Sequence, residues 1–304
     1  MVYRLENGKL KQIAQHTSNK NGSRFLAVDV ADINGNGRDE IFVTNQNGSE
    51  LKSFVLETNP DQKQRLDKIW ENVRLYFRII RPFGDKPKLL AQGYGFLDPF
   101  AGGIKTVEYQ GNGYVVGSEI SLPPVQGMQY ILYGLTQTSI SSSKTNETII
   151  LDKDYHLRVY SPGGRLLVKS DEYYGHDPRL VDTGVKEDPV GGVKRGEPVN
   201  FRGRLQFVQH GGKRFLFIPK NYTAGGGLLA KAVIVNDSSL AVLGVTEEGF
   251  SRFAETKKQK GYIAAYQIVD VPKTNETRVH AVAVQDGGLL GKTISTLFTY
   301  NWRN

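Results

Sequence analysis

A short stretch of Asp, Asn and Gly residues carries the clearest chemistry in this chain. Residues 32–41 read DINGNGRDEI, with a carboxylate or amide at almost every second position. Calcium loops place oxygen ligands at positions 1, 3, 5, 7 and 9, with a backbone carbonyl at position 7 and a glycine at position 6. Counted from Asp32, Gly37 falls at position 6. The predicted calcium ligands are Asp32, Asn34, Asn36, the Arg38 carbonyl and Glu40.

The same loop also fits a simpler interpretation. Asp32 and Glu40 are the charged ligands of the set, and Arg38 brings a cation close to them, so calcium affinity is expected to be modest. Asn and Gly residues in this pattern also form tight turns whose side chains bond to their own backbone. A calcium site and a metal-free hairpin turn therefore both remain open from the sequence.

The segments that must position this loop predict an all-β protein. Short alternating stretches, separated by Gly, Asn, Asp or Pro, recur at the spacing of a sandwich, barrel or propeller. One helical turn is expected at residues 61–70, after Pro60. The predicted strands are 25–30, 40–44, 73–79, 113–120, 130–135, 148–151, 156–160, 165–169, 205–209, 214–218, 229–235, 240–245, 262–270, 278–284 and 295–300.

A repeated pentapeptide indicates that the strands belong to a repeat. KTNET occurs at residues 144–148 and again at 273–277, and each copy precedes an apolar strand, as GNGRDE does in the first loop. A polar turn that carries a Glu and leads into a strand is thus the shared unit. In both KTNET copies a Lys opens the turn and one carboxylate, Glu147 or Glu276, stands alone, so these turns are predicted to hold no metal.

The first loop resembles the D-x-D/N-G-D/N-G-x-x-D/E-hydrophobic signature of FG-GAP or VCBS repeats, the blades of integrin-α-like propellers. The stretches FLAVDVADINGNG, SELKSFVLE, YGLT, DYHLRVY and GYIAAYQIVD are similar to those of FG-GAP/VCBS proteins from Gram-negative, delta-proteobacteria-like genomes. The resemblance implies one β-propeller domain over residues 1–304, with about five to seven four-stranded blades. In that group the propeller follows a signal sequence and a small α/β domain. A periplasmic, outer-membrane-associated or extracellular location is therefore implied, with the signal sequence upstream of this chain.

The two ends of the chain bear on how the ring closes. The start, MVYRLENG, reads as the middle of a strand, so the first strands of the first blade are expected to be missing. Closure hides the sheet edges of a propeller, and the final strand, 295–300, is expected to pair with residues 2–5. Otherwise an open edge should make the chain associate. The polar, Gly- and Pro-containing segment 178–204 is expected to be a surface excursion, with a linker between two domains as the alternative.

Composition excludes several functional classes. The chain has no cysteine, which rules out disulfides, zinc–thiolate sites and cysteine nucleophiles. No transmembrane segment is predicted, because no window approaches the roughly 18 apolar residues that a spanning helix needs. The net charge of +8 is spread along the chain, so nucleic acid is not expected as a partner. The five histidines are scattered, and no catalytic residue is predicted.

These observations favour a non-catalytic interaction or scaffold module rather than an enzyme. Its expected partner is a protein or polysaccharide of the cell envelope, and calcium is its one predicted cofactor. Two alternatives remain. Propellers also carry enzymes, such as a polysaccharide lyase or hydrolase, in their central channel. A basic module that docks on an anionic surface would instead need a contiguous face of Lys and Arg.

Overall fold

The structure, a computed structural model, describes most of the chain, and every regular element in the described part is a β-strand. The described residues are 2–6, 9–17, 23–59, 65–81, 86–95, 98–140, 146–183, 185–187, 193–196, 198–210, 213–223, 235–271, 276–285 and 292–302. No helix long and apolar enough to cross a membrane occurs within these ranges. The predicted all-β class is confirmed.

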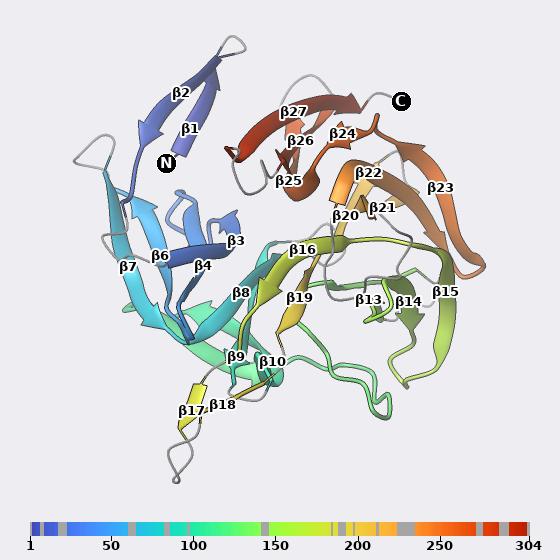
Figure 1. The fold of residues 1–304 in the computed structure, drawn as a ribbon, viewed down its shortest axis with the longest axis horizontal. Coiled ribbons are helices and arrows are strands. Elements are labelled where there is room, and N and C mark those ends of the chain that lie inside the picture. The colour runs from blue at the N-terminus through green and yellow to red at the C-terminus, as the bar shows by residue number, and fades with distance from the viewer. Residues whose placement is uncertain are drawn as a thin grey trace.

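The main strands form five antiparallel sheets arranged as the blades of a propeller (Figure 1). Blade I contains β3 (Ser23–Ala31), β4 (Glu40–Asn47), β6 (Ser53–Thr58) and β7 (Leu66–Val73), and β5 (Glu50–Leu51) pairs with β4. Blade II contains β8 (Leu75–Ile80), β9 (Lys88–Tyr94), β10 (Phe100–Tyr109) and β11 (Tyr114–Glu119). Blade III contains β12 (Leu135–Thr138), β13 (Glu147–Leu151), β14 (His156–Tyr160) and β15 (Leu166–Tyr173).

The last two blades follow the same antiparallel meander. Blade IV contains β20 (Gln206–His210), β21 (Lys213–Thr223), β22 (Val235–Thr246) and β23 (Gly249–Glu255), and β24 (Gln259–Lys260) pairs with β22. The described strands of blade V are β25 (Tyr262–Val271), β26 (Glu276–Gln285) and β27 (Ile294–Trp302). The propeller prediction is therefore confirmed, and the described strands form five blades, within the predicted range.

The segment between blades III and IV contains the predicted excursion, 178–204. β16 (His176–Val181) pairs with β19 (Val199–Arg202), and Val181 and Phe201 are buried in the core. β17 (Val185–Glu187) pairs with β18 (Val193–Arg195), and Figure 1 shows this hairpin projecting from the ring. The two ends of the segment thus contribute to the core, while the hairpin is its projecting part.

Two local predictions are wrong. Of the helical turn expected at 61–70, residues 66–70 belong to β7 and pair with β6 from Thr58↔Leu66 to Val55↔Trp70, and residues 61–64 lie outside the described residues. Residues 130–134, expected in a strand, are irregular, and their backbone is hydrogen-bonded to the side chain of Gln92 instead of to a neighbouring strand. Gln92 Oε1 accepts from the Leu132 amide at 2.8 Å, and its Nε2 donates to the Tyr130 carbonyl at 2.8 Å. The predicted strand 229–235 lies, except for its last residue, outside the described residues.

The predicted closure of the ring is also wrong. β1 (Val2–Glu6) pairs with β2 (Lys9–Ala14) as a hairpin, which packs on blade I through Val2 and Ala14. Among the described strands, β27 pairs with β26 alone. Within the part of the chain that the structure describes, blade V therefore presents an outer strand with one unpaired edge.

Apolar side chains from facing sheets join most neighbouring blades. Burial of such surface is the main favourable contribution to folding. The clusters join blades I and II through Phe42 and Phe77, II and III through Phe100 and Ile150, III and IV through Leu157 and Leu216, and IV and V through Phe217 and Tyr266. In the part of the chain that the structure describes, no such cluster joins blade V to blade I.

Candidate binding cleft and the loop of blade I

The loop predicted as a calcium site connects β3 to β4 and folds around the Asp32 carboxylate. Asp32 Oδ1 accepts hydrogen bonds from the amides of Gly35 and Asn36, at 2.8 and 3.1 Å. Asp32 Oδ2 accepts one from the Gly37 amide, at 2.9 Å. Gly35 and Gly37 have φ angles of 74° and 82°, left-handed values that glycine adopts without strain. The glycine spacing therefore lets three consecutive amides point at one carboxylate.

A second carboxylate, Glu57 on β6, closes the other side of the loop. Glu57 Oε1 accepts from the Nδ2 atoms of Asn34 and Asn36, at 2.9 and 2.7 Å. Its Oε2 lies 2.7 Å from Arg38 Nη2. Burial raises the pKa of the Glu57 carboxyl, but the hydrogen bonds from Asn34, Asn36 and Arg38 outweigh it, so the net shift is downward. Glu57 is therefore held in its charged form.

Glu40, the last predicted ligand, is turned into the interior. Its side chain is fully buried, and its Oε2 accepts from the Ile33 amide at 2.7 Å. Burial raises the Glu40 pKa to about 6, against the lowering effect of the Ile33 amide and of Tyr114. Glu40 Oε1 and the Tyr114 hydroxyl oxygen are both buried atoms without a hydrogen bond that meets the geometric criteria in the described structure.

The first KTNET copy repeats the Glu40 contact in blade III. Glu147 begins β13 as Glu40 begins β4, and Glu147 Oε2 accepts from the Ile140 amide at 2.9 Å. In both blades the carboxylate thus binds the amide seven residues before it. Glu276 likewise begins β26, while residues 144, 145 and 273–275 lie outside the described residues. The predicted position of a Glu at the start of the following strand is therefore confirmed for blades I and III, together with its contact to the preceding chain.

The side chains of the predicted ligand loop also form hydrogen bonds to the loop's own backbone. The Oδ1 atoms of Asn34 and Asn36 accept from the amides of Asn36 and Arg38, at 3.0 and 2.9 Å. An amide oxygen has two lone pairs, so each of these Asn oxygens keeps the capacity for a second partner. Within the described ranges, no three His, Cys, Asp or Glu side chains are grouped to hold a metal ion. Calcium stays a prediction from the sequence.

An ionic cluster that the sequence did not reveal joins blades I, II and IV. Asp29 on β3 is almost fully buried and lies 3.4 Å from Arg78 Nη1 and 3.0 Å from Arg204 Nη2. The Arg78 guanidinium also lies over the Tyr133 ring, 4.7 Å from its centroid. Burial lowers the pKa of Arg78, and Asp29 opposes that shift. Both arginines form ion pairs with the Asp29 carboxylate, so Asp29 links the blades.

A cavity of about 980 Å³ lies where blades V and I meet without a shared apolar cluster in the described structure, and Gln206, Phe207 and Val208 on β20 of blade IV also line it. Val28 and Val30 on β3 form one wall, and Val269, Val282 and Leu297 of blade V form the other. Val28 is 48% exposed and Leu297 is 39% exposed. The cavity is therefore a cleft between two half-exposed apolar sheet faces.

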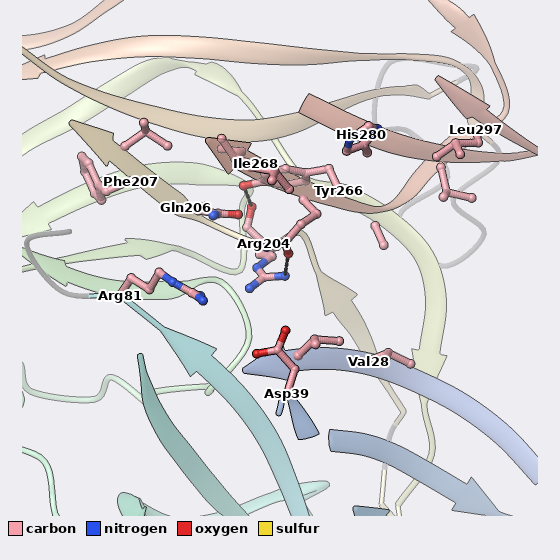
Figure 2. A pocket seen from close by; sticks show the side chains of 16 residues that line it. Val28, Asp39, Arg81, Arg204, Gln206, Phe207, Tyr266, Ile268, His280 and Leu297 are labelled. Carbon is pink, nitrogen blue, oxygen red and sulfur yellow. Dashed lines mark hydrogen bonds between the residues drawn. The ribbon is translucent and has the colours of Figure 1, made fainter. Parts of the chain in front are cut away.

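Polar groups converge at one end of this cleft. Figure 2 shows the guanidinium groups of Arg81 and Arg204 and the carboxylate of Asp39 pointing into the same part of the cavity. Arg204 is paired with Asp29, whereas the side chains of Arg81 and Asp39 make no hydrogen bond or ion pair in the described structure. Gln206 Oε1, also in the lining residues, is buried without a hydrogen-bond partner. Arg81 and Asp39 can thus bind polar groups of a ligand.

A histidine also lines the cleft, on β26. The His280 Nδ1 atom lies 2.9 Å from Thr299 Oγ1. Burial lowers the His280 pKa, and Arg278 adds to the shift, so the ring is neutral at pH 7. It therefore offers the cleft a hydrogen-bonding group rather than a positive charge. An apolar cavity with a few convergent polar groups is typical of a binding site.

Comparisons with known proteins identify no family for this chain. No family model matches the chain, and no curated protein matches it. A solved structure similar to it is "a mutant of Trypanosoma rangeli sialidase displaying trans-sialidase activity", with 12% identity and a TM-score of 0.35. That match covers 99% of this chain, and this chain spans 56% of the sialidase chain. The chain's own sheets show that the protein is a five-bladed β-propeller, and its resemblance to FG-GAP/VCBS repeats stays a prediction.

Proposed function

We propose that the protein is a non-catalytic binding module that holds an apolar peptide segment of a protein partner in the cleft between blades V and I. The supporting observation is that two half-exposed apolar faces, Val28 and Val30 opposite Val269 and Leu297, meet across a cavity of about 980 Å³. Covering these water-exposed aliphatic walls with apolar groups is favourable, because it removes apolar surface from water.

The chemistry of the walls favours a peptide over a polysaccharide. Aliphatic side chains offer little to the hydroxyl groups of a sugar, whereas they match alternating apolar residues of an extended peptide. Arg81 adds a guanidinium without an ion-pair partner in the described structure, which suits a carboxylate because the two groups can form paired hydrogen bonds. The expected ligand is thus an apolar segment that carries an Asp, a Glu or a terminal carboxylate.

The proposal of a non-catalytic role is supported by the state of the buried carboxylate at the blade junction. Asp29 is engaged by Arg78 and Arg204 and is 1% exposed, so it is not placed to exchange protons with a substrate. The polysaccharide enzyme stays the alternative, and measured turnover on a panel of polysaccharides would favour it. The envelope location also stays a prediction, drawn from the resemblance.

Peptide selection followed by affinity measurement tests the proposal. Random dodecapeptides displayed on phage would be selected on the purified protein, and the enriched sequences synthesised with a fluorescent label. We expect apolar sequences with an acidic residue, and fluorescence anisotropy should show at least tenfold weaker binding to Val28→Asp and to Arg81→Gln. Thermal unfolding would show that both variants fold.

Val115→Asp provides the matched control. Val115 lies on β11 and is 44% exposed, but it does not line the cleft. Binding should therefore be unchanged in this variant. Selected peptides that bind Val28→Asp and Arg81→Gln as tightly as the original protein would contradict the proposal.

A further inference from the structure

The outer strands of blades I to IV carry features that keep other strands from pairing with them. The outer strands are β7, β11, β15 and β23, and their charged residues include Asp67, Lys68, Glu71, Glu119, Lys169, Asp171, Glu172, Arg252 and Glu255. Each of the four also pairs with its inner neighbour through at least one shift of register. Charges and bulges are the means by which natural sheets protect their edges.

β27, the outer strand of blade V, has none of these features. Its sequence, ISTLFTYNW, contains no charged residue, proline or glycine. It pairs with β26 over nine consecutive residue pairs without a shift of register. Ile294 is 58% exposed, and no other described strand pairs with the outer edge of β27. This edge is flat, uncharged and rich in β-branched and aromatic residues, all of which favour strand addition.

We propose that β27 pairs with β27 of a second copy of this chain, as antiparallel strands that join two propellers edge to edge. Antiparallel pairing about Phe298 would place Ile294 opposite Trp302 and Thr296 opposite Tyr300 of the second copy. Pairs of a β-branched and an aromatic residue are among the favourable cross-strand combinations. The strand is thus complementary to itself.

Self-pairing also explains why the outer edge of β27 lacks the charges and register shifts that the outer strands of blades I to IV carry. A two-fold arrangement uses the same edge of both copies, so it closes after two chains and leaves the outer edge of β27 covered in both. The proposed contact uses the outer edge of β27, while the cleft uses the face of β27 that carries Leu297. The inference is therefore independent of the proposed peptide binding, and either can fail alone.

Light scattering coupled to size exclusion would measure the mass of the purified chain over a hundredfold range of concentration. We expect the mass to rise from 33.8 kDa toward twice that value as concentration increases. Hydrogen–deuterium exchange should slow with concentration at residues 294–302 and remain unchanged on the other outer strands. The variant Ile294→Lys/Thr296→Lys should stay at the monomer mass, because charges on an edge oppose pairing.

The matched control places two lysines on β11, at Val115 and Val116, which are 44% and 40% exposed. This control variant should form dimers as the original chain does. A monomer at all concentrations would overturn the proposal, as would a dimer that survives in Ile294→Lys/Thr296→Lys. Concentration-independent protection of the β27 amides that point away from β26 would also overturn it, because that result would show a strand of the same chain on this edge.

Discussion

The guanidinium of Arg179 donates a 2.8 Å hydrogen bond to the backbone carbonyl of Leu26 and so links β16 to blade I. The same side chain donates to the Ala264 carbonyl of blade V at 3.0 Å and lies 4.4 Å from the centroid of the Phe201 ring. Asp177, 1% exposed, lies 2.6 Å from Arg179 Nη2. Arg179 thus joins the first and last blades, which share no apolar cluster in the described structure.

Replacing Arg179 by methionine should destabilise the fold by about 3–5 kcal/mol, because the buried Asp177 would lose its partner. Urea unfolding at pH 7 measures the change. The double variant Asp177→Asn/Arg179→Met should recover part of the loss, since it removes the buried charge. If the two single changes and the double change were simply additive, the ion pair would not carry the predicted coupling.

Glu40 should make the protein less stable as pH rises. Its pKa of about 6 in the folded protein is above the ordinary value of 4.5, so the folded state binds the proton more tightly. Stability from this group is present below pH 4.5 and is lost as pH rises through about 6. The difference in free energy of unfolding between Glu40→Gln and the original protein should therefore shift in favour of the variant by about 1–2 kcal/mol between pH 4.5 and pH 7.5. Urea unfolding at both pH values tests this, and a constant difference would contradict it.

Glu57 should have the opposite pH dependence. Its pKa is lowered in the folded protein, so its stabilising contribution is present above the ordinary value of 4.5 and is lost as pH falls through the folded value. Glu57→Gln should cost about 1–3 kcal/mol at pH 7 and speed amide exchange at Gly35, Asn36 and Gly37. Asp154→Ala, an exposed carboxylate outside this loop, is the control. Unchanged exchange in the Glu57 variant would show that the loop folds without it.

The glycine at the sixth position of the loop is predicted to matter for its backbone angle alone. Gly37 has φ of 82°, and a Cβ added there would meet no atom within 4 Å. Gly37→Ala should therefore cost about 1–2 kcal/mol through backbone strain without a steric clash. Gly163, which also has open space but no left-handed φ, is the matched control, and Gly163→Ala should be neutral or slightly stabilising. Equal effects in the two variants would contradict this explanation.

Sequence patterns predicted strands where apolar and polar residues alternate regularly. They failed where glycines interrupt the alternation or where a distant side chain binds the backbone. β4, β13 and β14 follow the predicted ranges closely. β10 was not predicted, because Gly102 and Gly103 interrupt its alternation, and its pairing with β9 shifts register there. Residues 130–134 resembled a strand, but their backbone is satisfied by the Gln92 amide. A contact with a side chain forty residues away leaves no local signal.

The candidate site was predictable for its turn and not for its cleft. The Asp32 turn can be predicted from the sequence because the Asp32 carboxylate and the amides that bond to it lie within six residues. Glu57 reaches the loop through the pairing of β4 with β6, which the sequence of the loop does not encode. Val28 and Leu297 each lie in an alternating strand pattern, at positions typical of core residues. Their exposure arises because blades V and I share no apolar cluster in the described structure, which the strand patterns do not indicate.

The most direct test of the binding cleft is methyl NMR on protein with labelled valine and leucine, titrated with a phage-selected peptide. The cleft residues to be followed are Val28, Val30, Val269, Val282 and Leu297. We predict that their methyl signals shift during the titration, while those of Val115 and Val116 on β11 stay fixed. Peptide-dependent shifts that spare the cleft residues and appear elsewhere would contradict the central claim.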